Sequence, residues 1–77
     1  MPQKHYIESK AAADAAPVKK VTENAEEAVT YFKNMFQQLF KKAPSEEVQK
    51  DLCFSMIGNE KFYYTEDGAS ILVKEAY

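Results

Sequence analysis

The sequence predicts a small α+β protein with a flexible N-terminal arm, a two-helix hairpin and a C-terminal two-stranded antiparallel β-hairpin. Three observations support this prediction. Residues 24–43 carry apolar side chains at alternating steps of four and three, which is typical of an amphipathic helix. A second, shorter helical pattern covers residues 45–58. Beyond it, two runs rich in aromatic and β-branched residues flank Asp67-Gly68, a pair that strongly favours a tight hairpin turn.

Length and composition indicate one folded domain, and its small net charge does not point to a particular class of binding partner. The chain has 77 residues, of which 45% are hydrophobic and 13% aromatic, and its net charge is -2. These values argue against global disorder and against a general attraction to nucleic acid or anionic membranes. One cysteine cannot form an intrachain disulfide, and we find no signal peptide or apolar run of membrane-spanning length. We therefore expect a soluble, cytoplasmic protein.

The first part of the chain differs in composition from the rest. It contains the simple stretch AAADAAP, and Pro17 interrupts any helix that begins before it. We therefore predict a flexible arm over residues 1–21 and a single small α+β domain over residues 22–77. Within the arm, residues 9–16 could be helical, and residues 5–7 could alternatively form a short strand.

The first helix has recognisable signals at both ends. Asn24 is a good N-cap, and Glu27 follows it at the spacing of a capping box. Pro44 is expected to close the helix, because the residue before a proline is pushed out of the helical region. On its apolar face, Phe36 is predicted to be buried, so that its truncation to alanine is costly. The side chains expected to be buried together where the two helices meet are Phe32, Phe36, Leu39, Leu52 and Met56.

The second helix is predicted to start at Ser45, whose hydroxyl can cap it, and to stop at Gly58 in a left-handed conformation. The short link between the helices predicts an αα-hairpin. The residues expected to share the apolar face of the second helix are Val48, Leu52, Cys53, Met56 and Ile57.

The sequence leaves the register of the C-terminal hairpin open. A two-residue turn pairs Phe62 with Val73, but it also opposes Lys61 with Lys74, which is unfavourable. A three-residue loop with a glycine bulge would instead place Lys61 opposite Glu75.

No group of residues has the spacing of a catalytic or metal site. His5 is the only histidine and is expected to be exposed in the arm, whereas Cys53 is expected to be a buried helix cysteine. These two residues cannot complete a zinc site, and a Cys–His nucleophile would need a third group. Glu46, Glu47 and Asp51 suit a helix start for local reasons. We therefore expect no enzyme activity, cofactor or metal.

The aromatic residues suggest a binding function, because more of them are present than two helices and a hairpin can readily cover. We expect a small regulatory, inhibitory or accessory factor that binds another protein or a second copy of itself as a homodimer. The candidate protein-binding residues are Tyr31, Phe54, Tyr63, Leu72 and Tyr77.

The alternative function is a nucleic-acid-associated regulator. Helix, short link, helix and hairpin also describe part of a winged helix, and the arm carries Lys4, Lys10, Lys19 and Lys20. However, the second helix offers only Lys50 as a cation, and the hairpin tip is acidic. Nucleic-acid binding is therefore the less favoured prediction.

Overall fold

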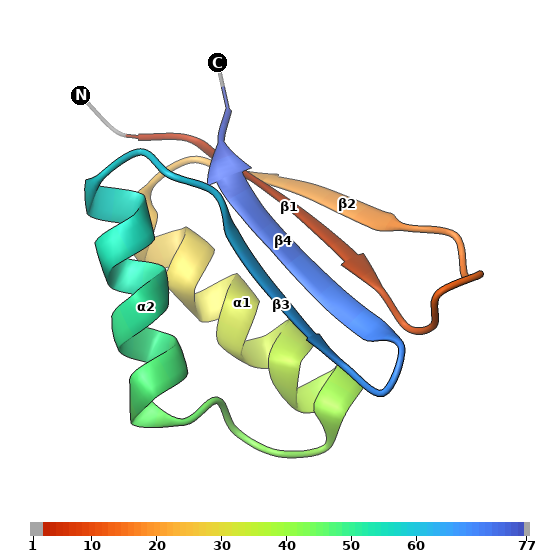
Figure 1. Ribbon diagram of the computed structural model, residues 1–77. Coiled ribbons are helices and arrows are strands. Elements are labelled where there is room, and N and C mark those ends of the chain that lie inside the picture. Colours follow the sequence, from red (N-terminus) through yellow and green to blue (C-terminus); the bar gives the residue numbers. More distant parts are fainter. Residues whose placement is uncertain (1–2, 77) are drawn as a thin grey trace.

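The N-terminal residues form two strands of a four-stranded antiparallel sheet, and both helices pack on one face of that sheet (Figure 1). The structure is a computed structural model that describes residues 3–76. The strand order is β2-β1-β4-β3. The elements in chain order are β1 (His5–Lys10), β2 (Val18–Thr22), α1 (Ala25–Phe40), α2 (Glu46–Ile57), β3 (Phe62–Glu66) and β4 (Ala69–Glu75).

The predicted flexible arm is wrong. β1 lies in the middle of the sheet, paired with β2 on one side and with β4 on the other. Its Ile7 side chain is 0% exposed and belongs to the hydrophobic core. β2 runs across the expected boundary at residues 21 and 22, so the predicted arm and domain share one sheet. The alternative of a short strand at residues 5–7 is confirmed, whereas the helix over residues 9–16 is not formed.

α1 begins as predicted and ends early. The Asn24 side chain accepts a hydrogen bond from the Glu27 backbone N–H at 2.8 Å. The helix ends at Phe40 rather than at residue 43, because Lys41 takes a left-handed conformation with φ 61°. The Lys41 N–H then donates to the Gln37 carbonyl at 3.0 Å, which satisfies one of the last free acceptors of the helix.

α2 has the predicted N-cap and is capped at Gly58 as predicted, but the backbone conformation at that end differs. The Ser45 hydroxyl accepts a hydrogen bond from the Val48 N–H at 3.2 Å. The prediction of a left-handed Gly58 is wrong, since its φ is -85°. Asn59 takes the left-handed position instead, with φ 55°. Asparagine tolerates this region better than most residues that carry a side chain.

Only part of the predicted apolar face of α2 is buried. Leu52 and Met56 are buried and Val48 is half-buried, as expected, whereas Cys53 and Ile57 are exposed. α2 packs near β3, an edge strand of the sheet, so the sheet meets one side of the helix and leaves the neighbouring side uncovered (Figure 1).

The C-terminal hairpin has the two-residue register. Phe62 pairs with Val73 across a turn in which Asp67 has φ 51° and Gly68 has φ 86°. Positive φ at both central positions is the conformation that Asp-Gly favours in a tight hairpin. The three-residue alternative is therefore wrong.

The core lies between the helices and the sheet. The Phe32 ring meets the Phe62 ring edge-on at a centroid distance of 5.5 Å, and the Phe36 ring lies 4.9 Å from the Tyr64 ring. Of the five side chains predicted to be buried together, four are buried and Leu39 is half-buried. The buried core consists of Ile7, Ala28, Phe32, Phe36, Leu52, Met56, Phe62, Ile71 and Val73.

Candidate functional site

The structure distributes the predicted binding residues over separate surfaces. Tyr31 is half-buried on α1, and Phe54 is 69% exposed on α2. Tyr63 and Leu72 form a directly paired couple on the sheet face that the helices leave uncovered. Tyr77 lies outside the described residues. The four described candidates therefore do not form one continuous surface, and among them only Tyr63 and Leu72 come together.

The most exposed large apolar side chains lie on α2. Among the described residues, Ile57 is 81% exposed and Phe54 is 69% exposed. Cys53 is exposed beside them, and Ala25 and Val29 of α1 continue the surface toward the start of that helix. We call these five residues the α2 strip. A contiguous apolar surface indicates an interaction site, whereas single exposed apolar side chains are common on any protein.

Two hollows border the α2 strip. Both have almost wholly apolar walls and are open to solvent, with volumes of about 410 Å³ and 220 Å³. Cys53 and Ile57 line both hollows and form the ridge between them. The first is lined by Glu46, Gln49, Lys50, Cys53, Phe54 and Ile57, and the second by Ala25, Glu26, Val29, Cys53, Met56 and Ile57.

The uncovered face of the sheet has a different character, with tyrosines and lysines side by side. Its residues, from the strand pairing, include Tyr6, Glu8, Lys10, Lys19, Val21, Tyr63, Leu72 and Lys74. The Lys74 ammonium lies 5.1 Å from the centre of the Tyr6 ring, and the Tyr6 hydroxyl donates to Glu8 at 3.2 Å. We call this surface the outer sheet face.

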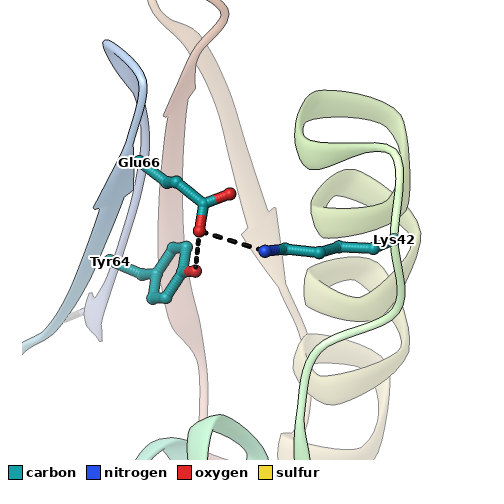
Figure 2. A network of polar contacts seen from close by, with 3 residues as sticks. All are labelled: Lys42, Tyr64 and Glu66. Carbon is teal, nitrogen blue, oxygen red and sulfur yellow. Dashed lines mark hydrogen bonds and ion pairs between the residues drawn. The ribbon is translucent and has the colours of Figure 1, made fainter.

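A small polar network joins Lys42, in the link that follows α1, to β3. Figure 2 shows the Lys42 ammonium and the Tyr64 hydroxyl both directed at one carboxylate oxygen of Glu66, at 3.1 Å and 3.0 Å. The hydrogen bonds from Lys42 and Tyr64 hold the pKa of Glu66 below its usual value. The hydrogen bond to Glu66 raises the pKa of Lys42. The pKa of Tyr64 is also raised, mainly because its hydroxyl is desolvated and to a smaller extent because it is bonded to the same carboxylate. The network is at the surface, so it stabilises the fold only modestly.

Replacing Glu66 with glutamine is expected to flatten the acid limb of the stability curve. The pKa of Glu66 is lowered by folding from 4.5, so its contribution is complete above that pH and is lost as the pH falls through the folded-state pKa. Urea midpoints measured from neutral pH to pH about 2 should therefore fall less steeply in Glu66→Gln than in the unmodified chain. Glu60→Gln, at an exposed position outside the network, is the matched control. Identical acid limbs for all three proteins would contradict the proposed role of the network.

The predicted burial of His5 and Cys53 is wrong for both residues. His5 is 2% exposed and faces the core from β1, whereas Cys53 is exposed on α2. Two buried side-chain atoms, His5 Nδ1 and Ser9 Oγ, have no hydrogen-bond partner among the described residues. Across residues 3–76, His, Cys, Asp and Glu side chains form no group of three that could hold a metal ion.

None of the helices in the described part of the chain is both long and apolar enough to cross a membrane. Comparison of the whole chain with protein-family models, curated proteins and solved structures finds no match.

Proposed function

We propose that this chain is a small, non-enzymatic protein-binding factor and that the α2 strip is its contact surface. The observation that carries this proposal is the exposure of Phe54 and Ile57, at 69% and 81%, on a helix that already buries Leu52 and Met56 against the core. A short helix that presents apolar side chains to both core and solvent leaves part of its hydrophobic surface without a partner.

The geometry around the strip supports binding by side-chain packing. Phe54 and Ile57 project next to hollows with apolar walls, so a partner could bury these side chains and place its own in the hollows. Anchors of this type, aromatic or large aliphatic side chains at the centre of a patch, contribute most of the affinity in many protein interfaces. Charged residues at the margin would form the polar rim.

Nucleic-acid binding remains the second candidate, now through the outer sheet face rather than a flexible arm. Lys10 and Lys19 lie on that face with Lys74, close to Tyr6 and Tyr63. Tyrosine rings on a sheet can stack on unpaired bases, and lysines can contact phosphates. The face is less favoured because Glu8 lies directly opposite Lys19 and offsets part of its charge.

One set of bait proteins distinguishes the two candidates. Immobilised unmodified chain, the double variant Phe54→Ser/Ile57→Gln and the outer-face variant Tyr63→Ser are incubated with lysate from cells that carry the gene, and captured proteins are quantified by mass spectrometry. We expect a captured protein that Tyr63→Ser retains and that the double variant loses by at least about tenfold. Circular dichroism of each bait verifies that its fold is intact.

The opposite pattern would overturn the proposal. Capture that the double variant retains, that Tyr63→Ser loses and that nuclease treatment abolishes would assign the function to nucleic acid and the outer sheet face.

A further inference from the structure

We propose that the α2 strip binds a cationic amphipathic helix of another protein. This inference rests on the proposed protein-binding function and adds the chemistry of the partner to it. Three arguments support it. They are the shape of the strip, the charges around it, and the poor fit of those charges to a second copy of the chain or to an anionic lipid surface.

The shape of the strip fits a helix better than an extended segment. Ile57 and Cys53 form a ridge with one apolar hollow along α2 and another between α2 and the start of α1. Ridges and grooves of this kind interdigitate with side chains three and four residues apart on a partner helix. An extended strand would need free backbone groups at a sheet edge, whereas the backbone groups in the middle of α2 are already hydrogen-bonded within the helix.

Acidic side chains outnumber cations among the residues that line the two hollows. Glu46 lines the first hollow and Glu26 lines the second, and Lys50 is the only cation among the described residues that line either hollow. Two further exposed acids of α2, Glu47 and Asp51, lie outside the hollows. An apolar surface with an acidic margin is complementary to a helix that has an apolar face flanked by lysine or arginine.

The same charges disfavour two other occupants. A symmetric pair of copies would use the same patch on both chains, so two acids, Glu26 and Glu46, against one cation, Lys50, would be brought from each copy into one interface. An anionic lipid surface attracts helices whose apolar face is bordered by lysine and arginine, which is the reverse of this strip.

The test uses two peptide probes that differ only in charge. The first is a capped, fluorescently labelled peptide of about 20 residues in which leucines at helical spacing form one face and lysines the other, and the second has glutamate in place of every lysine. Fluorescence anisotropy with the full chain is expected to give at least about tenfold tighter binding for the lysine peptide. Raising the salt from about 0.05 M to 0.5 M should weaken that binding, because screening shortens the range of the attraction.

Cys53 provides a second readout located on the strip itself. It is the only cysteine in the chain and is exposed, so its alkylation by iodoacetamide reports on coverage of the strip. Saturating lysine peptide is expected to slow alkylation of Cys53 several-fold, and the glutamate peptide at the same concentration should not. An unchanged alkylation rate with bound lysine peptide would place that peptide elsewhere and overturn the inference.

Matched variants separate the apolar contribution from the charge contribution. Ile57→Gln should weaken lysine-peptide binding by at least about tenfold, whereas Val21→Gln, at a 49% exposed position on the outer sheet face, should leave it unchanged. The double variant Glu26→Gln/Glu46→Gln should keep the apolar contacts but lose most of the preference for lysine over glutamate.

The outcomes distinguish failure of this inference from failure of the proposed function. Equal or tighter binding of the glutamate peptide, still sensitive to Ile57→Gln, would overturn the cationic partner and leave the α2 strip as a protein-binding surface. Peptide binding that is insensitive to Ile57→Gln would overturn both. Protection of Cys53 without peptide, either on self-association in sedimentation or on vesicles of phosphatidylcholine and phosphatidylglycerol, would assign the strip to a second copy or to lipid.

Discussion

Replacing Phe36 with alanine is expected to lower the free energy of unfolding by about 3–5 kcal/mol, as truncation of a buried aromatic side chain does. Phe36 is 1% exposed, and its ring centre lies within 5.7 Å of three others, those of Phe32, Phe40 and Tyr64. The substitution removes a ring from the middle of this cluster, and neighbours on both a helix and a strand cannot all move in to fill the space. Urea unfolding followed by circular dichroism measures the change.

Phe54→Ala is the matched control, because it makes the same chemical change at a position that is 69% exposed. It is expected to change the free energy of unfolding by no more than about 0.5 kcal/mol. A comparable loss for both variants would contradict the assignment of Phe36 to the core and Phe54 to the surface.

The helices could be predicted from the sequence because their signals are local. Asn24 and Ser45 satisfy backbone N–H groups within the next turn, so their roles depend on residues only three positions away. The ends were harder to predict. Lys41 ends α1 in a left-handed conformation ahead of Pro44, whereas α2 is capped at Gly58 as predicted and the left-handed residue is the next one, Asn59.

The N-terminal strands were harder to recognise, and only residues 5–7 were offered as a strand, because the alternation of β1 and β2 is mostly polar. On β1 the side chains that face the helices are His5, Ile7 and Ser9, and only one of them is a typical core residue. β2 carries Lys19 and Lys20 and leaves four of its five residues exposed, so it lacks an apolar face. The central place of β1 follows from its pairing with β4, a contact between opposite ends of the chain that no local pattern encodes, and β2 joins the sheet through β1.

The α2 strip was only partly predictable for a similar reason. The helical pattern places Phe54 at the surface, but it puts Cys53 and Ile57 on the same buried face as Leu52 and Met56, whereas both are exposed. Apolar residues on adjacent sides of one helix leave open which side meets the core, and the position of the sheet decides it. This difference supports the proposed binding surface. Cys53 and Ile57 fit the apolar pattern of a buried helix face, yet the fold leaves them exposed.

Deleting residues 1–20 is expected to abolish cooperative folding, which is the largest effect that we predict. β1 is paired on both sides, and its removal would leave a two-stranded hairpin of β3 and β4 beneath the helices. A two-stranded hairpin is marginal in water. The deletion would also remove Ile7, which is 0% exposed, and uncover its neighbour Val73. A chain of this length is stable by only about 4–12 kcal/mol, at roughly 0.05–0.15 kcal/mol per residue, so the loss of a central strand exceeds what the remainder can tolerate.

Thermal unfolding followed by circular dichroism tests this expectation. Two point variants of the full chain distinguish the loss of core contacts from other effects of shortening the chain. The truncated chain should show no cooperative transition. In the full chain, Ile7→Ala should lower the free energy of unfolding by about 2–5 kcal/mol, whereas Val21→Ala, at a 49% exposed position on the edge strand, should change it by at most about 1 kcal/mol. A truncated chain that melts cooperatively with the helical signal of the full protein would show that β1 is dispensable, and the first 20 residues would then be an appendage of a domain formed by the helices and the C-terminal hairpin.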